Sequence, residues 1–238
     1  MLIQPIETII FDLDGTLRHN LPSADDVQFN FALSLGVPDA PRKQILGTRW
    51  SHFYWAQSSD FFDDMDEFGD MDDRFWVRYS YRYLMALALP DALATDLAPR
   101  LFQHMKDAFA PQSTVFPCVP ETLQALKDGG YSLGLVSNRS NPCQEECEQL
   151  GLLGYFDFAY VAAEVEAWKP DPRVFDRALE ISGSTPDHTI YVGDNFYADV
   201  LGAQNAGLQP VLLDPKGVFP DAACQIIRSI RELGDILL

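Results

Sequence analysis

The chain has 238 residues, of which 47% are hydrophobic and 12% aromatic, so a substantial core is expected and wholesale disorder is not. Its formal net charge of −18 argues against nucleic acid and anionic membranes as partners, because both are polyanions. An anionic substrate remains compatible with this charge, since a bound metal ion can reverse the field within one cleft.

The first predicted element is a β-strand at residues 6–11, with the sequence IETIIF. No basic region precedes its apolar residues, so the segment is interpreted as a strand and not as a signal peptide. No apolar run in the sequence approaches the roughly 18 residues of a membrane span. The four cysteines contain no CxxC motif and are expected to be reduced thiols. Together these features predict a cytoplasmic protein.

Two aspartates, Asp12 and Asp14, follow this strand directly. Two unit charges about 4 Å apart interact by roughly 4 kcal/mol at an effective dielectric constant near 20, and between carboxylates this interaction is repulsive. We therefore expect a cation, a shifted pKa or both at this position. An Asp-Gly pair after a strand is also a common turn, so on its own the pattern is ambiguous.

The next segment, 18–113, shows helical patterns and no convincing strand. Residues 23–36 begin with a Ser23/Asp26 capping box, and 74–89 and 93–109 also suit helices. We expect a helical domain inserted after the first strand. Residues 60–73 carry eight acids in 14 residues but do not fit the ligand spacing of an EF-hand, so they are predicted to be a solvated acidic segment with its aromatic side chains turned inward.

After the insertion, strand-like and helix-like segments alternate along the chain. Near-continuous apolar runs predict strands that are covered on both faces, as in a parallel sheet. The pattern indicates an α/β fold with a doubly wound, Rossmann-like parallel sheet, formed by residues 1–17 and 114–238. The predicted strands are 131–136, 156–161, 189–192 and 209–213, and the predicted helices are 120–130, 143–151, 172–182 and 198–207.

Polar residues that could bind a ligand or take part in a reaction follow several of these strands. Ser137 and Asn138 follow one strand, Asp194 ends another, and Asp199 comes five residues later. Lys169 precedes a Pro-Asp-Pro sequence that opens a helix. In open α/β sheets, ligands bind outside the carboxyl ends of the strands, so these residues are expected to form one site. Taken singly, they also suit helix caps, turns and a solvated loop lysine.

Four motifs, FDLDGTL, LVSN, KPDPRVF and VGDNFYADVLGAQNAG, occur in an order that resembles the haloacid dehalogenase-like (HAD) hydrolase superfamily. The resemblance covers residues 5–17 and 114–238. The helical segment 18–113 resembles the cap domain of the C1-capped phosphatase branch in position and helical character only.

The resemblance implies roles for the acids and for Lys169. Asp12 would be the nucleophile and form an aspartyl-phosphate, and Asp14 would be the general acid and base. Mg²⁺ would be bound by the Asp12 carboxylate, the Asp14 backbone carbonyl and the Asp194 carboxylate. Lys169 would offset charge on the transferring group and orient the nucleophile. Asp199 has two possible roles, support of the metal site and capping of the following helix.

The remaining candidates concern the phosphate and the rest of the substrate. Ser137 would bond a phosphoryl oxygen, with Thr16 and Asn138 nearby. Arg18, His19 and Arg49 are candidates for contacts with the rest of the substrate, although ordinary cap packing and surface charge are the better explanation for any single one of them.

We therefore predict a Mg²⁺-dependent phosphatase that acts on a small phosphorylated metabolite. The protein is expected to be a monomer or a homodimer. A phosphomutase similar to β-phosphoglucomutase would share every core residue and remains an alternative. A haloacid dehalogenase is less favoured, because dehalogenases that resemble this family lack an acid at the position of Asp14. A catalytically idle binding protein is disfavoured, because all four motifs are intact.

Overall fold

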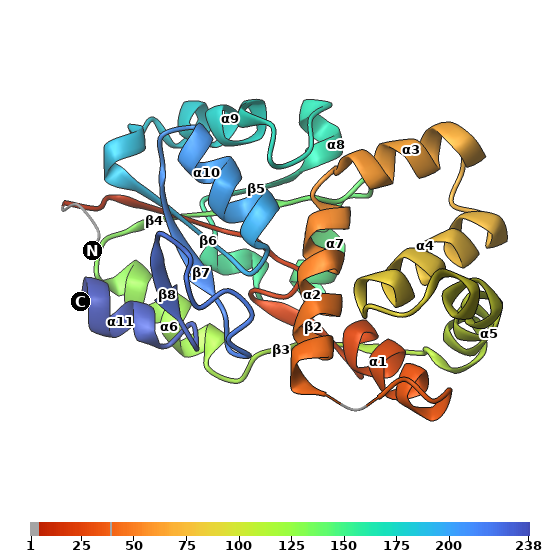
Figure 1. Cartoon of the computed structure of the whole chain (residues 1–238). Coiled ribbons are helices and arrows are strands. Elements are labelled where there is room, and N and C mark those ends of the chain that lie inside the picture. The colour runs from red at the N-terminus through yellow and green to blue at the C-terminus, as the bar shows by residue number, and fades with distance from the viewer. Residues whose placement is uncertain (1–4, 39) are drawn as a thin grey trace. The chain divides into compact units, whose positions relative to one another are not determined.

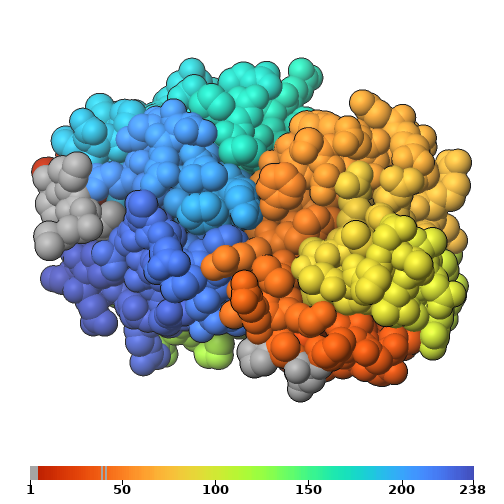
Figure 2. Space-filling view, viewed as in Figure 1, coloured from red at the N-terminus to blue at the C-terminus, as the bar shows by residue number. Residues whose placement is uncertain are grey.

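The computed structural model describes residues 5–38 and 40–238. The chain divides into two compact units, Met1–His19 with Thr114–Leu238 and Asn20–Ser113, which we call the α/β unit and the helical unit (Figure 1). Within each unit, side chains fill the space between the ribbons (Figure 2). The predicted boundaries at residues 17 and 114 fall near this division. Whether the units are independent domains remains a prediction.

The α/β unit is built on a six-stranded sheet with the strand order β5-β4-β1-β6-β7-β8. Every neighbouring pair in this sheet is parallel. The predicted α/β class and all five predicted strands of this sheet are confirmed. The sixth strand, β8, was not predicted. The strands are β1 Thr8–Phe11, β4 Ser132–Ser137, β5 Phe158–Val161, β6 Thr189–Gly193, β7 Gln209–Leu213 and β8 Gln225–Ile227.

Strand β1 shows why these sequences read as continuous apolar runs. Ile9 and Phe11 pack into one hydrophobic cluster, whereas Ile10 between them packs into another. Successive residues of a strand point to opposite faces, so both faces of the sheet are covered. Full burial of each such side chain contributes roughly 1.5–3 kcal/mol. The helices of this unit are α6 Val119–Asp128, α7 Gln144–Gln149, α8 Ala162–Val165, α9 Pro172–Ser182, α10 Leu201–Asn205 and α11 Glu232–Leu237.

The helix predicted at 198–207 differs in its first part. A π-helical turn, Phe196–Val200, precedes α10. Asn195 begins the turn, because its side chain accepts hydrogen bonds from the backbone N–H groups of Tyr197 and Ala198. Side-chain caps of this kind compete with regular helical hydrogen bonds, and this one moves the helical start ahead of the position that the sequence pattern indicates.

The helical unit contains α1 Ala24–Ser34, α2 Pro41–Trp55, α3 Ser59–Phe68, α4 Asp73–Ala86 and α5 Asp91–Ala108. The predicted cap of α1 is present, since Ser23 Oγ accepts a hydrogen bond from the Asp26 N–H at 3.1 Å. The expectation of no strand in 18–113 is wrong, because β2 Arg18–Leu21 and β3 Gln112–Val115 pair as a two-stranded sheet. Both strands are short and only partly buried, so they lack the apolar pattern on which the prediction depended. No helix in the described residues is both long and apolar enough to cross a membrane.

The interpretation of 60–73 as a solvated acidic segment is wrong at Asp64, whose side chain is fully buried. Arg82 Nε lies 2.9 Å from Asp64 Oδ2 and Arg82 Nη2 lies 2.9 Å from Asp64 Oδ1, while the Tyr54 hydroxyl donates a third hydrogen bond. A buried carboxylate needs such partners, and these come from other helices that a local pattern cannot reveal. Phe61 points inward as expected, whereas Phe62 is 51% exposed.

Candidate active site

The candidate site lies at the carboxyl ends of the central strands of the α/β unit. β1 lies between β4 and β6, and Asp12 comes directly after it. The Asp12 N–H donates to the Val192 carbonyl at 2.9 Å, which continues the pairing of β1 with β6 beyond the last strand residue. Asp12 is therefore fixed by the sheet itself and is only 5% exposed.

Lys169 occupies the centre of the site and is almost completely buried. Its Nζ lies 2.7 Å from Asp12 Oδ1, 2.6 Å from Asp199 Oδ1 and 2.9 Å from the Tyr191 hydroxyl. Burial alone would lower the pKa of Lys169, but the charges of Asp12 and Asp199 outweigh it and hold this pKa well above its usual value. Lys169 is therefore a permanent cation between two carboxylates.

The carboxylates of Asp12, Asp194 and Asp199 form a cluster in which one oxygen from each lies within 4.8 Å of the others. Thr16 Oγ1 lies 3.3 Å from Asp12 Oδ2 and 3.2 Å from Asp194 Oδ1 and so connects two of the acids. Burial raises the pKa of Asp12 to about 7 against the opposing charge of Lys169, with Asp199 and Asp14 adding to the rise. Burial and the charge of Asp12 likewise raise the pKa of Asp194 well above its usual value. One lysine does not neutralise this cluster.

Two glycines make room for these acids. Gly15 has a φ of +90°, and a Cβ at this position would lie 2.4 Å from Asp194 Oδ2. A Cβ on Gly193 would lie 2.3 Å from Asp199 Oδ2. The Gly of the Asp-Gly pair after β1 is therefore required both by the turn and by the close approach of Asp194.

Asp14 lies in a separate charged network on the same strand end. Arg139 makes a two-point contact, with Nε and Nη2 each 2.6 Å from an Asp14 oxygen, and Arg18 Nε lies 2.9 Å from Asp14 Oδ1. Both arginines also contact Glu146, at 2.5 Å and 3.3 Å. Ser137 Oγ lies 3.4 Å from Asp14 Oδ2, within reach of the same carboxylate.

Asn138 contacts the backbone of Lys169 through both ends of its amide. Its Nδ2 donates to the Lys169 carbonyl at 3.1 Å, and its Oδ1 accepts from the Lys169 N–H at 2.7 Å. This arrangement positions Lys169. The predicted phosphate contact of Asn138 would require the amide to release these bonds.

The three residues predicted to contact the rest of the substrate are placed differently from one another. The charge of Arg18 is engaged by Asp14 and Glu146. The His19 ring stacks on Phe116 with ring centroids 4.2 Å apart. Arg49 lies on α2 in the helical unit and is partly buried. Substrate contact remains a prediction for all three.

Sequence reasoning did not identify Arg139, Glu146 or Tyr191. Arg139 follows the Ser-Asn pair directly, so its position at a strand end was the signal available. Glu146 lies in the first turn of α7 and Tyr191 lies inside β6, where each resembles an ordinary helix or core residue. Only the three-dimensional structure shows that they contact site residues.

The chain is similar to known hydrolases in sequence. A family model described as haloacid dehalogenase-like hydrolase matches residues 6–207. Phosphoserine phosphatase of Thermus thermophilus is 28% identical over 236 residues, which cover 91% of this chain and 91% of that protein.

Two solved structures show the same fold. They are 2-haloacid dehalogenase from Pseudomonas syringae pv. Tomato DC3000, with a TM-score of 0.57 and 24% identity, and an HAD phosphatase from Thermococcus onnurineus, with a TM-score of 0.57 and 23% identity. Each alignment covers 98% of both chains. Because one is a dehalogenase and the other a phosphatase, the fold alone does not distinguish these reactions.

Proposed function

The chain belongs to the haloacid dehalogenase-like hydrolase family, and on this premise we propose that it is a Mg²⁺-dependent phosphatase that uses Asp12 as its nucleophile. The predicted family and the predicted enzyme class, a hydrolase of the phosphatase type, are confirmed. The observation that carries the proposed mechanism is the buried Asp12 carboxylate, held 2.7 Å from Lys169 within a cluster of three acids.

In the first half of the proposed reaction, an Asp12 oxygen attacks the phosphorus of the substrate. The bond between phosphorus and the ester oxygen breaks, and the leaving alkoxide takes a proton from Asp14. In the second half, Asp14 takes a proton from a water molecule whose oxygen attacks the same phosphorus. The bond from phosphorus to Asp12 then breaks, which releases inorganic phosphate and restores the Asp12 carboxylate.

Lys169 serves both halves of this reaction. Because it holds Asp12 Oδ1, it fixes the orientation of the nucleophile, and its charge offsets the negative charge that accumulates as the phosphoryl group is transferred. Asp199 and Asn138 hold the ammonium and the backbone of Lys169. We therefore assign Asp199 and Asn138 to positioning, and phosphoryl contacts to Thr16 and Ser137.

In this structure Asp14 forms an ion pair with Arg18 and accepts hydrogen bonds from Arg139. This arrangement suits the step in which Asp14 takes a proton from water. For the preceding step Asp14 must carry a proton, so we propose that it turns away from at least one arginine when substrate binds. Its 39% exposed side chain has room to do so.

The donor set fits a hard divalent cation, because the acids are clustered and buried and their charge exceeds that of Lys169. We propose that the Asp12 and Asp194 carboxylates and the Asp14 backbone carbonyl bind Mg²⁺, with Asp199 in support through Lys169 and the Asn195 N–H. When bound, the cation supplies positive charge to the cluster and to the phosphoryl oxygens.

We further propose that the helical unit is a cap that contributes substrate selectivity, with Arg49 among its contributors. The substrate class is a small phosphorylated metabolite, and a cytoplasmic location and a monomeric or homodimeric state stay part of the proposal. The presence of Asp14 favours a phosphatase over a dehalogenase, because it provides the acid that an ester leaving group needs.

Hydrolysis of p-nitrophenyl phosphate tests this function. The protein with Mg²⁺ is expected to release nitrophenol, Asp12→Asn to lose roughly 10³-fold or more of kcat, and Asp221→Asn, which alters an exposed carboxylate of the same unit, to match the unchanged protein. EDTA is expected to abolish the activity and Mg²⁺ to restore it. Activity that survives either EDTA or Asp12→Asn contradicts the proposal.

A panel of phosphorylated metabolites, assayed for free phosphate, then defines the substrate class. Conversion of one phosphosugar isomer into another without release of phosphate would identify a phosphomutase instead.

A further inference from the structure

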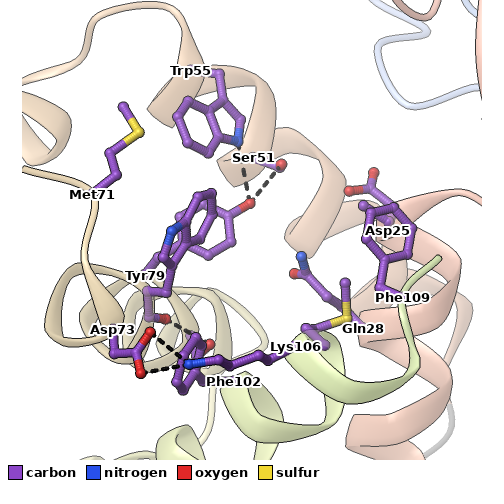
Figure 3. A pocket seen from close by; sticks show the side chains of 14 residues that line it. Asp25, Gln28, Ser51, Trp55, Met71, Asp73, Tyr79, Phe102, Lys106 and Phe109 are labelled. Carbon is purple, nitrogen blue, oxygen red and sulfur yellow. Dashed lines mark hydrogen bonds and ion pairs between the residues drawn. The ribbon is translucent and has the colours of Figure 1, made fainter. Parts of the chain in front are cut away.

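A second candidate site lies inside the helical unit and includes none of the residues discussed above. It is a cavity of about 470 Å³, within the roughly 300–1,000 Å³ typical of small-molecule pockets. α1, α2, α4 and α5 all contribute to its lining (Figure 3). Aromatic side chains form much of the wall, among them Trp55, Trp76 and Phe102. Such a wall favours an aromatic or other apolar body.

One buried acceptor in this pocket lacks a donor. Gln28 is 8% exposed and lines the pocket, and its Oε1 has no hydrogen-bond partner among the described residues. A buried acceptor without a partner is costly, so the position is suited to a ligand that brings an N–H or O–H group.

The charges of the pocket indicate which donor fits. Asp25 lies three residues before Gln28 on α1, which places both side chains on one face of the helix (Figure 3). No cation in the described part of the chain pairs with Asp25. The lysine of the pocket, Lys106, is instead held by Asp73 at 2.7 Å and 2.9 Å. The pocket therefore has an excess of negative charge beside the open acceptor.

The hydroxyls of the pocket already have partners in the protein, and Ser80 Oγ donates to the Trp76 carbonyl at 2.9 Å. The Tyr79 hydroxyl oxygen lies 3.1 Å from Ser51 Oγ and accepts a hydrogen bond from Trp55 Nε1 at 3.3 Å (Figure 3). Burial raises the pKa of Tyr79 to about 12, so its phenol stays neutral. The polar recognition of a ligand consequently falls to Asp25 and Gln28.

We propose that this pocket binds a small molecule with an aromatic or apolar body and a primary ammonium group. An ammonium has three N–H donors, so one group can bond to both Gln28 Oε1 and the Asp25 carboxylate. The apolar body lies against the tryptophans. This binding site goes beyond the proposed phosphatase activity and does not depend on it.

Three compounds of similar size test the proposal on the full chain. 2-Phenylethylamine and 2-phenylethanol differ in the charge and donors of the polar end, phenylacetate carries a carboxylate there, and calorimetry or quenching of the tryptophan fluorescence reports their binding. The amine is expected to bind at least tenfold more tightly than the alcohol, and phenylacetate is expected to bind most weakly.

Variants then assign the contacts. Asp25→Asn is expected to weaken binding of the amine roughly tenfold and to leave the affinity for the alcohol unchanged. Gln28→Leu is expected to weaken binding of both compounds roughly tenfold. Gln28→Leu removes an unpaired buried acceptor and also the hydrogen bond between the Gln28 amide and Tyr79, so the two effects oppose each other and the thermal midpoint without ligand should change little. Asp96→Asn, an exposed change on α5 outside the pocket, should have no effect.

Asp12→Asn should bind the amine with unchanged affinity, which separates this proposal from the phosphatase mechanism. The proposal is overturned if the amine shows no saturable binding, which would mean that the pocket holds only water. It is also overturned if phenylacetate binds as tightly as the amine, or if Asp25→Asn and Gln28→Leu leave binding unchanged.

Discussion

Lys169 determines the energetics of the site at the scale of single residues. Its ammonium is the shared counter-charge of Asp12 and Asp199, and all three side chains are at least nine-tenths buried. The KPDPRVF motif predicted that Lys169 belongs to the site, but no pattern predicted its contact with the Tyr191 hydroxyl. Pairwise contacts between distant residues depend on the packing of the sheet, which a linear motif does not encode.

Replacing Lys169 with methionine should destabilise the metal-free protein by about 3–5 kcal/mol, because two buried carboxylates lose their counter-charge. Urea denaturation monitored by circular dichroism gives the free energy of unfolding. Lys127→Met is the matched control, because Lys127 Nζ donates to the exposed Gly154 carbonyl at 3.3 Å, and this substitution should cost less than about 1 kcal/mol. Equal effects of the two substitutions would contradict the assigned role of Lys169.

At the scale of elements, the turn after β1 is the part of the site that sequence reasoning predicts best. The order strand, Asp, Asp-Gly fixes the position of the turn, and the parallel sheet fixes the edge at which it lies. Arg139 and Glu146 were missed because their contacts around Asp14 depend on how α7 packs beside that edge. Strand β8 was missed because three residues are too short for a periodic signal, and β2 and β3 because backbone pairing orders them without an apolar face.

Gly15→Ala tests the turn. It forces a side chain into a φ of +90° and against Asp194, so we expect a loss of stability of roughly 1–3 kcal/mol and a strong loss of activity. Gly183→Ala separates the two effects, because that glycine also has a positive φ of +68° but has no atom within 4 Å of the added Cβ. Gly183→Ala should therefore reduce stability and leave activity unchanged. The interpretation fails if Gly15→Ala and Gly183→Ala reduce turnover equally.

At the scale of the whole molecule, two groups of acids lie in the interior of the protein, the cluster of Asp12, Asp194 and Asp199 in the α/β unit and the network at Asp64 in the helical unit. Composition predicted which partners to exclude, and the spacing of Asp12 and Asp14 predicted a cation, a shifted pKa or both. It could not predict that Asp64 is buried, because its arginine lies 18 residues away on another helix.

The raised pKa values of Asp12 and Asp194 predict a pH dependence of stability. A folded-state pKa of about 7, against an ordinary value of 3.8, means that the proton on Asp12 stabilises the metal-free fold at low pH and that this contribution is lost as pH rises through 7. Asp194 acts in the same direction. Because Mg²⁺ competes with these protons, it should raise the thermal midpoint more at about pH 8 than at about pH 5. Differential scanning fluorimetry with and without Mg²⁺ measures this difference, and equal shifts at both pH values would contradict it.

The nucleophilic role of Asp12 is tested most directly by mass spectrometry of the acid-quenched enzyme during turnover of a phosphomonoester. We expect the peptide containing Asp12 to gain the mass of one phosphoryl group and the same peptide from Asp12→Asn to gain none. The Asp14→Asn variant with p-nitrophenyl phosphate should accumulate the intermediate, because nitrophenolate leaves without a proton whereas the attacking water still lacks its base. A phosphoryl group on any other residue, or none on Asp12 in that variant, would contradict the nucleophilic role of Asp12.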